Sequence, residues 1–134
     1  MSQSGIFSLG TASHVYLEWD VSDGRTGRDL VAAIASLRGP RTTIGGVNLV
    51  SGFRPELWSE VMPGAAPSGL HGFNEAIAGV EGFAMPATQH DAVIWLSGST
   101  YDILYDTAHQ IISDLKGLAS VAEETTSWPY RHDR

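Results

Sequence analysis

The chain has 134 residues, a formal net charge of −7 and a hydrophobic fraction of 43%, which fits one soluble globular domain with a single core. The absence of cysteine excludes disulfides, thiolate nucleophiles, Cys-ligated zinc and iron–sulfur clusters. Lys116 is the only lysine and no apolar run approaches the roughly 20 residues of a membrane helix, so we expect neither a nucleic-acid nor a membrane partner.

The first half of the chain predicts two strands and two helices. Apolar and polar side chains alternate over His14–Val21, as in a strand with one buried face. Apolar residues at three- and four-residue spacing predict a helix over Leu30–Leu37. A second strand is expected over Val47–Phe53, because Arg54-Pro55 ends it. One or two helical turns are expected over Glu56–Met62.

A long connection over residues 54–90 then leads to the third strand. Pro63–Gly69 is a loop by composition, and Phe73–Val80 is expected to hold a short helical piece. The run from Ala92 to Leu96, which follows Asp91, is apolar at every position. We therefore expect this strand to be central in its sheet and covered on both faces.

The last part of the chain predicts a helix and a final strand. Ser99 and Asp102 resemble a capping box. A continuous apolar stripe follows from Ile103 to Leu118 and indicates a helix that packs on the core. Ser120–Trp128 is rich in threonine and valine and is expected to be a strand.

The order of these elements, β-α-β-β-α-β, predicts a ferredoxin-like α+β fold. We expect a single domain over residues 1–134, built as a four-stranded antiparallel sheet with two helices on one face. The other face would stay open although its third strand is apolar on both sides. A second domain, a second copy or a cofactor should therefore cover it.

Histidines are the first candidates for binding a metal or haem. The chain has five of them: His14, His71, His90, His109 and His132. No two are three or four residues apart. His109 is expected on a solvated helix face beside Asp106, and His14 and His90 at the surface at strand ends. His71 lies in a glycine-flanked loop, where it could be either a ligand or an ordinary surface residue. The role of His132, near the C-terminus, is also left open.

No other catalytic motif is present. There is no Gly-x-Ser-x-Gly elbow, no Ser-x-x-Lys and no phosphate-binding glycine loop. The carboxylate pairs Glu18/Asp20 and Glu123/Glu124 are expected to be solvated. Trp19 and Trp95 fall on apolar strand positions and are expected in the core. We therefore assign no catalytic residue, no metal ligand and no cofactor-binding residue from the motifs.

Four segments together resemble the N-terminal half of the dye-decolorizing (DyP-type) haem peroxidases, in particular the B-type group. They are Ser4-Gly5-Ile6, Val47–Trp58 (VNLVSGFRPELW), Pro86–Ser97 with its DAVIWLS run, and Pro129–Arg134. No single segment is as specific as a phosphate-binding loop. The likeness rests on their order and on the βαββαβ pattern, which was derived independently of them.

The resemblance implies a function for a complete protein that this chain alone would not perform. Family members are built from two ferredoxin-like halves with haem b between them. They reduce hydrogen peroxide and oxidise dyes, phenols or other reductants in one-electron steps. Their catalytic Gly-x-x-Asp-Gly loop would follow Arg134, and the distal arginine and proximal histidine come later. Ser22-Asp23-Gly24 is not that loop, since Asp20 stands where its glycine would be.

We therefore carry over no catalytic residue and assign none of the five histidines as a haem ligand. The isolated chain is expected to be inactive and to bind no haem by itself. Its expected partner is the C-terminal half of the same protein or a second copy, with a homo-oligomer as a further expectation. Because Met1–Gly10 has no basic segment followed by an apolar one, a cytoplasmic location is expected, free or inside a protein compartment.

Two alternatives stay open on the sequence. The chain could be a free-standing dimeric ferredoxin-like oxygenase whose sheet faces pair into a barrel, in which case a buried His or Asn should face a closed cavity. It could also be a non-catalytic binding module whose open sheet face docks a ligand or a partner.

Overall fold

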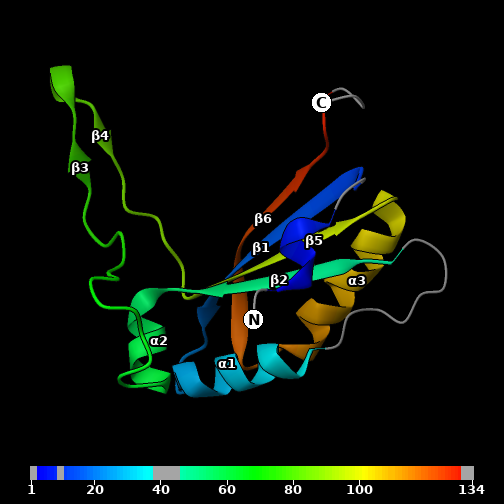
Figure 1. The fold of residues 1–134 in the computed structure, drawn as a ribbon, viewed down its shortest axis with the longest axis horizontal. Coiled ribbons are helices and arrows are strands. Elements are labelled where there is room, and N and C mark those ends of the chain that lie inside the picture. The colour runs from blue at the N-terminus through cyan, green and yellow to red at the C-terminus, as the bar shows by residue number, and fades with distance from the viewer. Residues whose placement is uncertain (1–2, 9–10, 38–45, 131–134) are drawn as a thin grey trace.

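The computed structural model describes residues 3–8, 11–37 and 46–130, so His132 lies outside the described residues (Figure 1). The elements are, in chain order, η1 Ser4–Phe7, β1 Ser13–Val21, α1 Gly27–Ser36, β2 Asn48–Phe53, α2 Pro55–Val61, β3 Ile77–Ala78, η2 Val80–Gly82, β4 Ala84–Met85, β5 Ala92–Gly98, α3 Tyr101–Asp114 and β6 Ala119–Ser127. None of the helices in these described ranges is long and apolar enough to cross a membrane.

Four strands form one antiparallel sheet in the order β2-β5-β1-β6. With the small β3–β4 hairpin set aside as an insertion, the order β1-α1-β2-β5-α3-β6 is the ferredoxin-like pattern. The expected fold class is confirmed, and α1 and α3 lie on the same side of the sheet (Figure 1). The one or two helical turns expected over Glu56–Met62 are confirmed as the short helix α2. It packs on the start of α1, where a side chain on Gly27 would overlap with Leu57.

The core lies between the sheet and the two long helices. In β1 and β5 every second side chain is buried, and Leu17 and Ile94 are both 0% exposed. The helices contribute one apolar stripe each. The buried residues that meet in this layer include Val15, Leu17, Trp19, Leu30, Ile34, Ile94, Leu96, Leu104, Ala108 and Ile111.

Strand β5 is central, as expected, but its second face is uncovered at Val93 and Trp95. Val93, between the buried Ala92 and Ile94, is 36% exposed. Trp95 is half-buried on the same side, so its expected place in the core is wrong. The apolar run over Ala92–Leu96 therefore marks a strand whose second face is uncovered in this chain.

The two long helices begin in different ways. In α1 the Thr26 hydroxyl accepts a hydrogen bond from the Asp29 amide, and the Asp29 carboxylate accepts one from the Thr26 amide. This capping box starts α1 at Gly27, one turn before Leu30, the first residue of its expected apolar stripe. The bond from the Thr26 hydroxyl also lowers the pKa of Asp29. The box expected at Ser99 does not form, because the N-cap of α3 is Thr100 and makes no side-chain capping bond.

The helix expected over Phe73–Val80 is wrong. Residues 64–90, here called the arm, form a projecting hairpin in which β3 pairs with β4 (Figure 1). At its tip Glu81 and Gly82 adopt positive φ angles of 55° and 79°, which turn the chain and do not fit a helix. Near its base the Glu56 carboxylate accepts bonds from the Gly72 amide and the Asn74 side chain.

The one-sided core predicts unequal costs for two neighbouring truncations. Ile94→Ala should lower the free energy of unfolding of the 134-residue chain by about 2–5 kcal/mol, because it leaves a cavity under the helices. Val93→Ala, on the uncovered face, should cost under about 1 kcal/mol. Urea unfolding measures both. Equal costs would contradict a core confined to one face of the sheet.

The arm base should respond to acid. The bond from the Asn74 side chain, with the backbone bonds, lowers the pKa of Glu56 from its usual 4.5. The stabilisation is therefore complete above pH 4.5 and is lost as the pH falls through the lower pKa of the folded state. The Gly72 amide resonance in an NMR titration should move with a midpoint below 4.5. A midpoint at or above 4.5, or an unchanged titration in Glu56→Gln, would refute this.

Candidate functional site on the open face of the sheet

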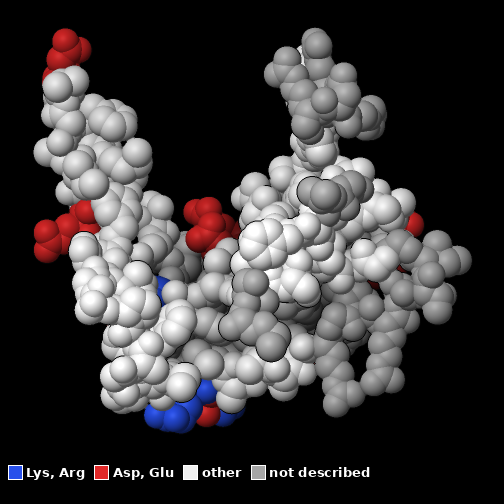
Figure 2. Space-filling model, viewed as in Figure 1, with Lys and Arg blue, Asp and Glu red and all other residues white. Residues whose placement is uncertain are grey.

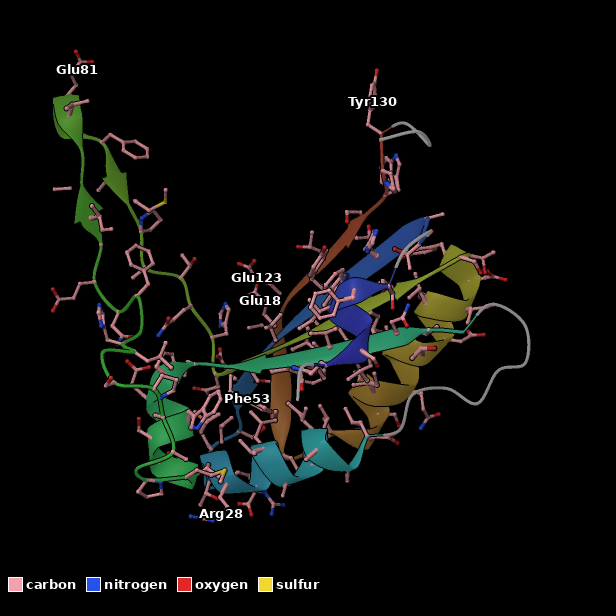
Figure 3. The ribbon with its side chains drawn as sticks, viewed as in Figure 1. Glu18, Arg28, Phe53, Glu81, Glu123 and Tyr130 are labelled. Atoms are coloured by element: carbon pink, nitrogen blue, oxygen red, sulfur yellow. The ribbon has the colours of Figure 1, made fainter. Side chains whose placement is uncertain are left out.

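The uncovered face of the sheet is the candidate site. From here on, the open face means the exposed and partly exposed side chains of β1, β5 and β6 that alternate with the buried ones, namely His14, Tyr16, Glu18, Asp20, Val93, Trp95, Glu123, Thr125 and Ser127. Ser97 lies on the same side of β5 but is buried. Figure 2 shows a hollow between the arm and the body of the domain, with acidic side chains at its floor. Figure 3 places Glu18 and Glu123 there.

An aromatic stack lies across the middle of the open face. The Trp95 ring lies between Tyr16 and His14, with ring centroids 6.0 Å and 5.9 Å apart and interplanar angles of 11° and 30°. The Trp95 indole N–H donates to Nδ1 of His14 over 3.1 Å. These contacts give the open face a preformed, flat, mostly apolar centre that a packed partner can cover.

Of the carboxylates expected to be solvated, Glu123 and Glu124 are exposed, and Glu18 and Asp20 are partly exposed. Glu18 of β1 lies directly opposite Glu123 of β6, because a bulge between Glu18 and Trp19 sets this register. Glu124 lies opposite Leu17 and therefore on the helix side. Like charges facing each other across two strands are destabilising, so both must stay hydrated or meet a cation or a donor. In the described ranges no three His, Asp or Glu residues form a group that could hold a metal ion.

One corner of the open face is a polar clamp. The Arg54 guanidinium contacts the Asp91 carboxylate at 2.9 Å, and the other oxygen of Asp91 accepts a bond from the Val21 amide at 2.8 Å. His90 Nδ1 lies 3.0 Å from Asp20. Beside them is a pocket of about 310 Å³ whose lining includes Glu18, Phe53, Arg54, His90 and Val93. The clamp joins the ends of β1, β2 and β5.

The other histidines are separate from this corner. His109 is exposed on α3 and stacks on Tyr105, with ring centroids 5.9 Å apart. His71 is in the arm, where its Nδ1 lies 2.8 Å from the Gly69 carbonyl oxygen. Of the four histidines in the described ranges, His14 and His90 border the open face. The contacts of His14 with Trp95 and of His90 with Asp20 could not be found from sequence, because both depend on the register between strands far apart in the chain.

Comparisons with known proteins identify the domain. The family described as Dyp-type peroxidase, N-terminal, matches residues 3–128. The chain belongs to this family. A dye-decolorizing peroxidase of Rhodococcus erythropolis is 27% identical over 129 residues, which are 92% of this chain and 37% of that protein. The chain thus spans well under half of this relative's length.

Solved structures of peroxidases share the fold of this chain. A variant of DypB from Rhodococcus jostii RHA1 in complex with heme superposes with a TM-score of 0.82 at 23% identity, over 98% of this chain and 44% of that one. The encapsulated DyP-type peroxidase of Mycobacterium smegmatis gives a TM-score of 0.72 at 20% identity, over 94% and 42%. At these identities the likeness concerns the fold of the N-terminal DyP domain.

The polar clamp of this DyP domain predicts an asymmetry between its two partners. Asp91→Ala should lower the free energy of unfolding by about 1–3 kcal/mol, because it leaves the Val21 amide and Arg54 without their acceptor. Arg54→Ala removes only a partly exposed ion pair and should cost under about 1 kcal/mol. Chemical unfolding of both variants measures the difference. If Arg54→Ala lowers the free energy of unfolding as much as Asp91→Ala does, the proposed asymmetry between the two residues is wrong.

Proposed function

We propose that this chain is the N-terminal domain of a haem peroxidase that reduces hydrogen peroxide and oxidises dyes, phenols or similar reductants. The family match over residues 3–128 is the observation that carries the proposal. The relative from Rhodococcus erythropolis is named a dye-decolorizing peroxidase, and the DypB variant is a complex with heme. In the complete protein the haem would be haem b.

The residues of the open face are better suited to line a haem cavity than to provide a ligand to the haem iron. Tyr16, Val93 and Trp95 offer an aromatic and apolar surface. Nδ1 of His14 accepts a hydrogen bond, so a neutral His14 carries its proton on Nε2, which would have to leave before that nitrogen could bind iron. When bound, haem supplies the redox chemistry, and this domain excludes water from one side of it.

The open face is the proposed docking surface for the C-terminal half of the protein. The relatives are more than twice as long as the matched segment. β6 leads from the open face toward Trp128, which is 73% exposed, and Tyr130, also exposed (Figure 3). Chain that continues beyond these residues would start beside the hollow. The aromatic and apolar centre of this face, over the central strand β5, gains most from being covered by such a segment.

The two alternatives are less well supported. A free-standing dimeric oxygenase and a non-catalytic binding module would both be built on the same fold, but neither accounts for the family match over residues 3–128. For the cell location we propose the cytoplasm, including the interior of a protein compartment. The neighbour from Mycobacterium smegmatis is an encapsulated enzyme.

Separate expression of the two halves tests the proposal. Residues 1–134 and the remainder of the complete gene product should associate, and the mixture with haem should show a Soret band and peroxide-dependent dye oxidation. The 134-residue chain alone should show neither above the level of free haem. A Soret band with a histidine ligand and dye turnover by residues 1–134 alone would overturn it.

A matched pair of variants locates the docking surface. Val93→Asp puts a charge on the open face and should weaken association of the two halves at least tenfold, as measured by titration calorimetry. Gln110→Asp makes the same kind of change on the exposed side of α3 and should leave association unchanged. Equal affinities for the two variants would place the interface elsewhere.

A further inference from the structure

The arm carries apolar side chains that no other part of the described structure covers. Its largest exposed apolar residues are Leu70, Phe73, Ile77, Val80, Phe83 and Met85. Val80, next to the tip, is 82% exposed. Soluble domains rarely expose contiguous apolar patches of this kind, so a projecting element with this composition is expected to bind another surface.

The arm is also held in a fixed direction at its base. Glu56 binds the Gly72 amide and the Asn74 side chain, and the Gln89 side chain accepts from the Phe73 amide at 3.0 Å and donates to Asn74. These bonds join both strands of the arm to each other and to α2. The tip is thus presented at a set distance from the domain, and less conformational entropy is lost when it binds.

A groove on the helix side of the sheet is complementary to this tip. It has a volume of about 290 Å³ and lies between β2, α1 and α2, lined mainly by Val31, Phe53, Trp58, Val61 and Met62. Trp58 and Met62 are 41% and 58% exposed. The groove is large enough for one or two apolar side chains and lies at the lower limit of small-molecule sites, about 300–1,000 Å³.

Charge complementarity points to the arm tip as the occupant. Arg28 lies at the rim of the groove, where its guanidinium donates to the Val61 carbonyl oxygen at 3.3 Å, and among the described residues it forms no salt bridge. Glu81 lies at the tip beside Val80. Figure 3 shows Glu81 and Arg28 at opposite ends of the molecule, so the tip and the groove of one chain are too far apart to meet.

Strand pairing at the groove is blocked, which leaves side-chain insertion as the mode of contact. β2 is an edge strand, and the Gln3 side chain occupies its free edge. The Gln3 amide donates to the Ser51 carbonyl at 2.7 Å, and its oxygen accepts from the Ser51 amide at 2.9 Å. A partner therefore cannot add a strand at Ser51, but it can place apolar side chains against Phe53 and Trp58.

We propose that the arm tip of one copy inserts into the groove of a second copy, with Val80 in the groove and Glu81 paired to Arg28. The contact joins two different surfaces, so it is heterologous and builds a closed ring if its rotation closes. The groove lies on the helix side of the sheet, opposite the open face. Both surfaces can therefore be occupied at once, and the contact is independent of the proposed activity.

Charge reversal in the complete gene product tests the contact. Arg28→Glu and Glu81→Arg should each raise the dissociation constant of the oligomer at least tenfold, as measured by analytical ultracentrifugation. The double variant should restore it to within about threefold of wild type, because each of its contacts again joins opposite charges. A one-to-one mixture of the two single variants should associate more tightly than either alone, since opposite charges meet wherever the two variants alternate. Lys116→Glu and Asp106→Arg make the same charge changes elsewhere and should have no effect.

Cross-linking gives a readout that does not depend on charge. The 134 residues contain no cysteine. If any cysteine elsewhere in the complete protein is replaced by serine, introduced cysteines report only on the designed contact. A mixture of Val80→Cys and Met62→Cys should form disulfide-linked dimers under mild oxidation. Neither variant alone should do so, and Lys116→Cys mixed with Val80→Cys should stay uncross-linked.

Three results would overturn the proposal. The first is a wild-type protein that is monomeric at all concentrations. The second is an oligomer whose mass is unaffected by both charge reversals while its cysteine mixture stays uncross-linked, since the groove then holds something else. The third is a Glu81→Arg variant that loses thermal stability while the mass of its oligomer is unchanged. The arm tip would then contact another part of the same protein molecule.

Discussion

The antiparallel pairing of β1 with β5 is the interaction on which the rest of the structure depends. It aligns Leu17 with Ile94 and Val15 with Leu96, which places one alternating set of side chains under α1 and α3. The same register necessarily collects Tyr16, Trp95 and Glu18 on the other side. Because side chains alternate along a strand, the core and the open face are two results of one pairing.

The asymmetry of this sheet links its fold to its proposed role. A domain of this size buries enough apolar surface on one face of the sheet to fold, and leaves the second face for another part of the protein. In this chain that second face has an aromatic centre around Trp95, a polar clamp around Asp91 and a hollow beside the arm. In the proposed peroxidase, these features position one wall of the haem cavity without contributing its ligand.

The elements with strong periodicity could be predicted from sequence, and the contacts between them could not. The alternation in β1 and the apolar stripe of α3 have direct physical causes in burial, so both appear in the sequence pattern. The short helix expected over Phe73–Val80 is wrong, because this part of the arm is held by bonds of the Glu56 and Gln89 side chains to the Gly72 and Phe73 amides, for which the local sequence carries no signal. The pairing of Arg54 with Asp91 depends on the β2–β5 register, for which the sequence contains no signal. The start of α1 had a detectable signal in Thr26 and Asp29, although aspartate replaces the usual glutamate or glutamine of a capping box.

Hydroxyl-radical footprinting with mass spectrometry tests the central claim most directly, because it reports side-chain accessibility residue by residue. The isolated 134-residue chain and the complete gene product would be compared at Tyr16, Val93 and Trp95, with Tyr101 and Tyr105 on α3 as internal references. We predict that oxidation of the three open-face residues falls severalfold in the complete protein while the two references stay unchanged. Equal oxidation of the open face in both proteins would contradict the account, since nothing would then cover the face that this chain leaves exposed.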